Sequence, residues 1–169
     1  FYTTTRTGID LAAGVSAIMP YYGIAMTGRD ASNKPIPLTY DGMTFPLTGF
    51  SFSSDMVDGL LRGKLGFQGY VNTDTGIVTM TPWGMEWKSE QVRIATAINA
   101  GADTLSGYST NATIKSLLDQ GLITQTRVNQ AVKRLLKEQF QLVLFENPYI
   151  DSSQADSTVG KADSVAKAQ

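Results

Sequence analysis

Three short segments in this chain have the pattern of a strand, and each is followed by a segment with the apolar spacing of an amphipathic helix. The strand segments are residues 15–19, which are mostly apolar, 69–73 and 102–106, and each ends in a loop marked by proline or glycine. A strand that returns to its sheet through a helix runs parallel to the strand before it. This order of elements therefore predicts an α/β fold, with a parallel sheet covered by helices.

Four helices are expected between and after these strands. They are predicted to begin at Ser53 or Ser54, to cover about 86–100 and about 111–120, and to begin again at Thr124. In the second helix, the predicted buried stripe consists of Trp87, Gln91, Ile94, Ala95 and Ile98. In the last helix, the predicted buried face consists of Val128, Ala131, Val132, Leu135, Leu136 and Phe140. Lys115, Lys133, Arg134 and Lys137 are expected on solvated helix faces.

Two segments lie outside this pattern. The segment between Tyr21 and about Ser51 is rich in Gly, Pro and Thr and shows no clear periodicity. A loop of about 30 residues is long enough to suggest a binding role or a local subdomain. Residues 151–169 consist largely of Ser, Ala, Asp and Lys, which predicts a linker, with the first turns of a helix near 163–169.

The composition excludes several classes of chemistry. The 169 residues contain no Cys and no His, so thiolate catalysis, Ser-His-Asp triads and His-ligated zinc are excluded. A net charge of −1 gives no electrostatic footprint for nucleic acid, and no apolar run is long enough to span a membrane. No metal-site spacing and no phosphate-binding glycine loop is present, so no cofactor is expected.

The carboxyl ends of the predicted strands are where ligands bind in parallel α/β folds. Asp74 is the one carboxylate at these three ends, where it could act as a nucleophile, as a base, or as a hydrogen-bond acceptor for a loop. Asp103 stands at the start of its strand and is expected to be structural. Trp83, in the loop after Asp74, is a candidate for stacking against the flat apolar face of a ligand.

Several segments resemble glycoside hydrolase family 3, the β-glucosidase family. Residues 60–74 (LLRGKLGFQGYVNTD) are similar to its helix–strand signature, which closes on the nucleophilic Asp, here Asp74. Residues 17–22 (AIMPYY) are similar to a stretch whose Tyr lies beside the nucleophile, which corresponds to Tyr22. Residues 97–103 and 127–149 match later segments of the same barrel domain. The resemblance covers about residues 8–150.

The resemblance implies a partial (β/α)₈ barrel of the TIM type, of about three βα units, because a whole barrel needs about 250 residues. Residues 1–150 would form its C-terminal part, and residues 151–169 a linker to a second, α/β-sandwich domain outside this chain. The family usually has Trp where this chain has Thr75, so Thr75 and Trp83 are expected to line the sugar pocket with Tyr22. The acid/base would come from the second domain, so the fragment alone is expected to be inactive.

The implied activity is a retaining hydrolase that releases terminal non-reducing β-D-glucose from a β-linked oligosaccharide or glycoside, in the periplasm or outside the cell. A β-xylosidase, an N-acetylhexosaminidase or a glycoside phosphorylase on the same scaffold remains an alternative. A non-catalytic sugar-binding fragment is the alternative from a different class. The partners implied are the glycoside, the rest of the barrel and the second domain, with neither nucleic acid nor membrane.

Overall fold

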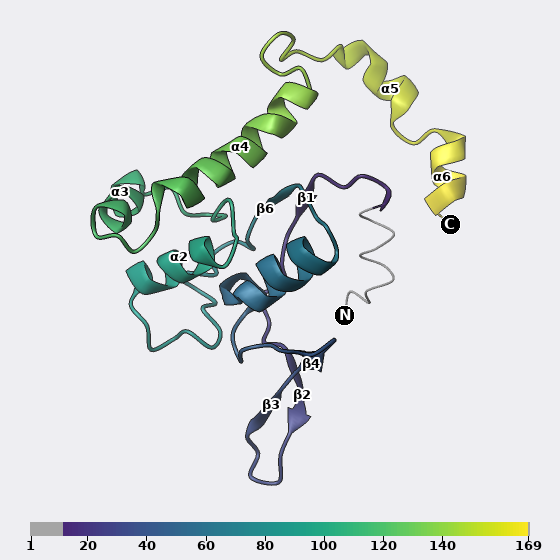
Figure 1. Cartoon of the computed structure of the whole chain (residues 1–169). Helices are drawn as coiled ribbons and strands as arrows, with labels where there is room; N and C mark the ends of the chain where they lie inside the picture. The colour runs from purple at the N-terminus through teal and green to yellow at the C-terminus, as the bar shows by residue number, and fades with distance from the viewer. Residues whose placement is uncertain (1–11, 169) are drawn as a thin grey trace. The chain divides into compact units, whose positions relative to one another are not determined.

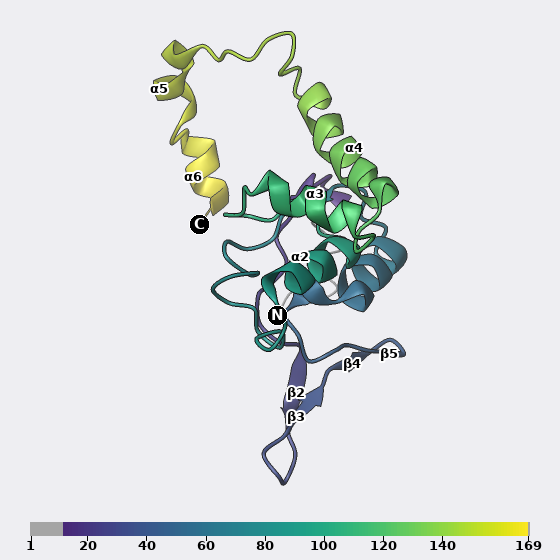
Figure 2. The same ribbon diagram turned by 90° about the vertical axis from the view of Figure 1, so that its left-hand side faces the viewer.

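The structure is a computed structural model that describes residues 12–168. Residues 1–11 of the predicted barrel part and residue 169 of the predicted linker lie outside the described residues. The chain divides into two compact units, residues 1–136 and residues 137–169. Figure 1 shows the elements of both in chain order, and Figure 2 shows them from the side.

The predicted strands are present and parallel, although they are shorter than expected. β1 (Ala17–Ile18) pairs in parallel with β6 (Tyr70–Val71), with Ile18 opposite Val71. The third predicted strand is a single parallel bridge between Asn72 and Thr104. The first unit is therefore a mixed α/β structure in which the three segments lie side by side in the predicted order.

Helices follow each strand position. They are η1 (Phe50–Phe52), the π-helix η2 (Asp55–Lys64), α2 (Glu90–Asn99), α3 (Asn111–Asp119) and α4 (Gln125–Gln141). The Ser53 hydroxyl accepts a hydrogen bond from the Met56 N–H at 3.2 Å, as a helix cap does. The Thr124 hydroxyl likewise accepts from the Arg127 N–H at 3.1 Å, so both predicted starts are confirmed.

The position predicted for Trp87 is wrong. The hydroxyl of Ser89 caps α2 by accepting a hydrogen bond from the Val92 N–H, so the helix begins at Glu90 and Trp87 precedes it. Trp87 is 74% exposed, whereas Ile94 and Ala95 are buried as predicted. The capping serine, rather than the apolar spacing, sets the start of this helix.

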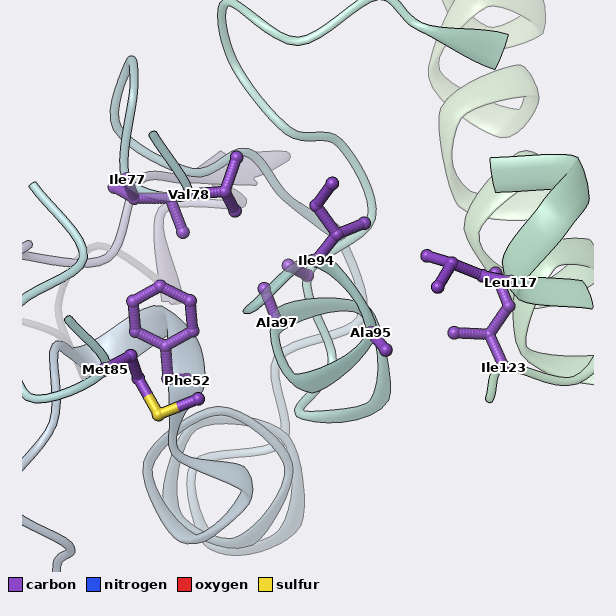
Figure 3. Packing of buried hydrophobic residues seen from close by; sticks show 10 residues of the cluster. Phe52, Ile77, Val78, Met85, Ile94, Ala95, Ala97, Leu117 and Ile123 are labelled. Carbon is purple, nitrogen blue, oxygen red and sulfur yellow. The ribbon is translucent and has the colours of Figure 1, made fainter. Parts of the chain in front are cut away.

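Two apolar clusters hold the first unit together. In Figure 3, α2 lies between Phe52 and Met85 on one side and Leu117 and Ile123 on the other. The second cluster packs η2 against the strands, and it consists of Val57, Phe67 and Val71 with the half-buried Ile18 and Leu61. These clusters anchor the strands whose carboxyl ends are candidates for a functional site.

The predicted buried face of α4 is wrong for this chain, because none of its residues is buried. Val132 is 46% exposed and Phe140 is 59% exposed. Val128, in the first turn of α4, packs against the first apolar cluster. The apolar side chains do lie on one face of α4. Among the described residues, however, the first apolar cluster contacts this face only in the first turn of the helix.

The segment predicted as a loop contains two antiparallel hairpins. β2 (Met26–Arg29) pairs with β3 (Pro35–Pro37), and β4 (Thr39–Tyr40) pairs with β5 (Met43–Thr44). Both views show β2 and β3 projecting beyond the helices of their unit (Figures 1 and 2). The turn between β4 and β5 is Asp41-Gly42, and both residues have positive φ, as a two-residue hairpin turn requires. The segment therefore has regular structure of its own, within the first unit.

The second unit is built of short helices. After α4 come η3 (Ser152–Gln154), α5 (Ala155–Thr158) and α6 (Ala162–Ala168). The rings of Phe140 and Phe145 lie 4.7 Å apart within this unit. The helix expected near 163–169 is present as α6. None of the helices in residues 12–168 has the length and apolar character needed to cross a membrane.

Candidate active site at the carboxyl ends of the strands

The parallel pairing of the strands places three of the predicted site residues at the same edge. Because Ile18 lies opposite Val71 and Asn72 opposite Thr104, the segments that begin at Met19, Thr73 and Leu105 emerge at the same edge. Carboxyl ends of parallel strands form the ligand-binding edge of α/β sheets. Tyr22, Asp74 and Thr75 therefore all come from this edge, as the sequence predicted.

Asp74 is half-buried and lies three residues after the end of β6. Its Oδ1 accepts a hydrogen bond from the Thr75 N–H at 2.6 Å. Within residues 12–168, no Lys or Arg side chain lies within ion-pair distance of this carboxylate. The remaining lone pairs of Asp74 are therefore available to a ligand.

Hydroxyl groups connect the turn of Asp74 to the neighbouring segment. The Thr73 Oγ1 is fully buried and accepts a hydrogen bond from the Ser106 N–H at 3.0 Å. The Thr75 and Ser106 hydroxyl oxygens lie 2.9 Å apart, and the Gly76 N–H donates to the Ser106 carbonyl at 3.2 Å. Asp74 therefore sits in a turn that is held on both sides, which limits the movement of its carboxylate.

Aromatic side chains cluster in the segments that follow β1 and β6. The rings of Tyr22 and Trp83 lie 6.4 Å apart at 43°, and those of Tyr21 and Tyr22 lie 4.9 Å apart. Phe50 packs edge-on against Tyr21 at 6.1 Å. Tyr22 is 39% exposed and Trp83 is 46% exposed, so both rings can still contact a ligand. Aromatic faces that remain partly exposed suit the C–H face of a sugar ring.

The other strand aspartate, Asp103, has a different environment. Its side chain is fully buried and pairs with Arg62 at 2.7 Å, Arg134 at 2.9 Å and Arg127 at 3.0 Å. It also accepts a hydrogen bond from the Val71 N–H at 2.9 Å. Asp103 is thus structural, as predicted, whereas the prediction that Arg134 lies on a solvated face is wrong. Asp103 draws Arg134 inward, and the Arg134 side chain is only 25% exposed.

Burial lowers the pKa of the Arg62 guanidinium below its ordinary value, while the attraction of Asp103 opposes that shift and Arg134 adds to it. An arginine keeps its charge at every pH at which a protein is normally folded. The lowered pKa therefore marks the desolvation of this group and leaves the ion pair with Asp103 intact.

The geometry adds four residues to those predicted for the site. Thr73 and Ser106 fix the Asp74 turn, and Tyr21 and Phe50 extend the aromatic cluster. The available signal was the presence of hydroxyl residues at the ends of two neighbouring predicted strands. Among the described residues, no group of three or more acidic side chains could hold a metal ion. Among residues 12–168, this edge thus offers the Asp74 carboxylate, hydroxyl groups and aromatic rings.

Comparisons with known proteins point to one family. Residues 7–137 match the family described as "Glycosyl hydrolase family 3 N terminal domain". The chain is 39% identical to "Beta-glucosidase C" of Emericella nidulans in an alignment of 160 residues that covers 89% of this chain and 24% of that protein. It is 32% identical to the "Periplasmic beta-glucosidase/beta-xylosidase" of Dickeya chrysanthemi, again over 89% of this chain and 24% of the relative.

A solved structure supports the same fold. The structure titled "Beta-glucoside phosphorylase BglX" matches with a TM-score of 0.63 at 22% identity, over 85% of this chain and 25% of that one. At this identity the likeness concerns the fold alone. The chain spans about a quarter of the length of the curated relatives described above.

Proposed function

The chain belongs to glycosyl hydrolase family 3, and we propose that it is the section of a retaining β-glucosidase that carries the catalytic nucleophile, Asp74. The observation that carries this proposal is the state of Asp74. It is a half-buried carboxylate at the ligand-binding edge, held by one backbone hydrogen bond and lacking a cationic partner among residues 12–168. Such a carboxylate can attack an anomeric carbon that is held in line with it.

A retaining mechanism needs two carboxyl groups about 5–5.5 Å apart. Asp74 is the first, and it forms the covalent glycosyl-enzyme intermediate. The second, the acid/base, protonates the leaving oxygen and then activates the attacking water. We assign it to a part of the protein outside this chain, since Asp74 is the one carboxylate that the predicted strand ends supply.

The proposed architecture follows from the parallel order of the strands. Residues 1–150 form the C-terminal part of a TIM-type barrel, and residues 151–169 lead to a second domain that supplies the acid/base. The site is completed only with the rest of the barrel, so the 169-residue chain alone is inactive. The apolar face of α4 that is exposed in this chain supports this arrangement, because a barrel helix packs along its whole length.

The proposed substrate is a β-linked glucoside or oligosaccharide whose terminal ring lies against Tyr22 and Trp83, with Thr75 as a hydroxyl partner. The name of the 39% identical relative supports glucose at this subsite. β-Xylosidase activity is the second candidate, because the Dickeya chrysanthemi relative carries both names. That relative is also named periplasmic, which supports a periplasmic or extracellular location for this protein.

A panel of nitrophenyl glycosides tests these assignments in the full-length enzyme. We expect the highest kcat/KM on the β-glucoside, lower values on the β-xyloside and the N-acetyl-β-glucosaminide, and no dependence on phosphate. The Asp74→Asn variant should lose turnover on every member of the panel. A requirement for phosphate, or a preference for the xyloside or the glucosaminide, would overturn the substrate assignment. If the wild-type protein bound sugar but did not turn over any of the glycosides, it would be a sugar-binding module and not a glycosidase.

A further inference from the structure

The rings of Tyr22 and Trp83 come from segments far apart in the sequence, and a third segment bridges them. This bridging segment, residues 47–50, is called the strap here. Its backbone forms hydrogen bonds with the segment that carries Tyr22 and with the segment that carries Trp83. The Gly49 N–H donates to the Trp83 carbonyl at 2.8 Å, and the Phe50 N–H donates to the Tyr21 carbonyl at 3.3 Å. Gly49 also forms an antiparallel bridge with Ile24, just beyond Tyr22.

Two glycines allow this close approach. A Cβ atom at Gly84, the residue after Trp83, would lie 2.1 Å from the Leu47 carbonyl oxygen and 2.7 Å from the Thr48 Cα. Gly84 also has a φ of +79°, which side-chain-bearing residues rarely adopt. A Cβ at Gly49 would lie 2.8 Å from the Tyr22 carbonyl oxygen. The contacts are with backbone atoms, which cannot turn aside as a flexible side chain could.

We propose that Gly84 and Gly49 are positioning residues that set the spacing between Tyr22 and Trp83 and thereby the affinity of the site for a sugar ring. This inference rests on the proposed function, because it takes the two rings as the surface that receives the glycoside. The ligand class is a pyranose, whose C–H face contacts one ring while its edge contacts the other. The two ring planes, inclined at 43°, form an angled surface of this kind.

Because the strap holds both segments, the surface formed by the Tyr22 and Trp83 rings is already ordered before a ligand binds. Trp83 is fixed on both sides, since its carbonyl accepts from Gly49 and its own N–H donates to the Thr81 carbonyl at 2.8 Å. The Gly84 N–H donates to the Glu86 Oε1 at 3.1 Å. A surface that is already ordered loses little conformational entropy when a ligand binds. A side chain at Gly84 would push the strap away and move Trp83 relative to Tyr22.

The first test is Gly84→Ala in the full-length enzyme, with nitrophenyl β-glucoside as substrate and free glucose as a competitive inhibitor. We expect KM and the glucose inhibition constant to rise about fivefold to tenfold, as the loss of one aromatic contact would cause, with kcat within about threefold. The matched control is Gly121→Ala, where φ is +69° and nothing lies within 4 Å of the new Cβ. It imposes the same backbone strain without the clash and should leave both constants unchanged.

A double-mutant cycle with Trp83→Ala separates positioning from general damage. If Gly84 acts through Trp83, Gly84→Ala should change the glucose inhibition constant less than twofold in the Trp83→Ala background. The proposal is overturned if the rise is the same in both backgrounds, or if Gly84→Ala behaves like Gly121→Ala. Wild-type turnover and its loss in Asp74→Asn would persist in that case, so failure of this inference is distinct from failure of the proposed function.

If the Gly84→Ala variant does not fold, Gly49→Ala provides a second test of the proposal. Gly49 has an ordinary φ of −55°, so its substitution adds only the 2.8 Å contact with the Tyr22 carbonyl. We expect a rise of the glucose inhibition constant in a wild-type background and none in a Tyr22→Ala background. An unchanged constant in Gly49→Ala, or equal rises in the two backgrounds, would overturn the proposal.

Discussion

Two aspartates on neighbouring strand segments, Asp74 and Asp103, have opposite environments. Asp103 is fully buried and shared by three arginines, and Arg62 also donates to the Gly69 carbonyl beside it. Asp74 is half-buried and accepts a hydrogen bond from the Thr75 N–H. The two residues are of the same type, but the Asp103 carboxylate has four hydrogen-bonding partners, whereas the Asp74 carboxylate has lone pairs that remain available to a ligand.

Under the proposed function, the two aspartates mark a stability end and a catalytic end of the paired strand segments. Asp103 lies before the Asn72–Thr104 bridge and Asp74 lies after it, so they stand at opposite ends of the paired segment. In α/β barrels the amino ends of the strands serve stability and the carboxyl ends serve catalysis. The partners of each aspartate follow this division, since cations gather at one end and hydroxyls and aromatic rings at the other.

The largest expected effect is that of Asp74→Asn in the full-length enzyme. Removal of the proposed nucleophile should lower kcat on nitrophenyl β-glucoside by at least about a thousandfold. The free energy of unfolding should change by less than about 0.5 kcal/mol, because Asp74 pairs with no charged side chain among the described residues. A kcat within tenfold of the wild type would show that Asp74 is not the nucleophile.

Asp103→Asn should have the reverse profile. It removes the carboxylate that pairs with three guanidinium groups in a largely buried site, which should destabilise the protein by about 3–5 kcal/mol. Below the melting temperature, the folded enzyme should keep kcat within about threefold. Urea unfolding and initial rates measured on one preparation check both statements. A stable Asp103→Asn variant with a greatly reduced kcat would contradict the assignment of stability to the Asp103 end of the strands and of catalysis to the Asp74 end.

Arg134→Met should destabilise the protein less than Asp103→Asn, by about 1 kcal/mol, because Arg62 and Arg127 still neutralise Asp103. Arg134 is also the most exposed of the three arginines, with 25% of its side chain exposed. Urea unfolding beside Arg62→Met provides the comparison, and Arg62→Met should cost more because Arg62 also bonds the Gly69 carbonyl at 2.8 Å. Equal losses for the two variants would show that these extra contacts contribute little.

Ser106→Ala should have the smallest effect. It removes the hydroxyl contact with Thr75 at 2.9 Å but keeps the Ser106 N–H bond to Thr73. We expect kcat/KM on nitrophenyl β-glucoside to fall about threefold, the equivalent of one weak hydrogen bond. Thr73→Val, which removes the buried acceptor, should lower it further, and Thr73→Ser should restore it. A larger loss in Ser106→Ala than in Thr73→Val would contradict the order of these contacts.

Much of the framework could be predicted from the sequence because it depends on local patterns. The strand positions, the starts of the helices at Ser53 and Thr124, and the place of Asp74 at a strand end all follow from apolar runs and capping residues. The hairpin turn at Asp41-Gly42 was not predicted, although an Asp-Gly pair is a strong hairpin signal.

Other features depend on contacts between distant segments and were therefore not predictable. The inward position of Arg134 requires Asp103, which is 31 residues away in the sequence. The exposure of Trp87 depends on Ser89 competing successfully as the helix cap. The strap that joins Tyr22 to Trp83 is formed by backbone hydrogen bonds and two glycines, and no apolar period reports such contacts.

The most direct test of the role of Asp74 is to trap the glycosyl-enzyme intermediate. A 2-deoxy-2-fluoro-β-glucoside with a good leaving group reacts with a retaining enzyme and releases the sugar slowly, so the covalent ester can be located by peptide mass spectrometry. The account predicts that the added mass of one sugar lies on Asp74 in the full-length enzyme. A label on a different residue, or continued turnover of the trapping reagent without any covalent adduct, would contradict it.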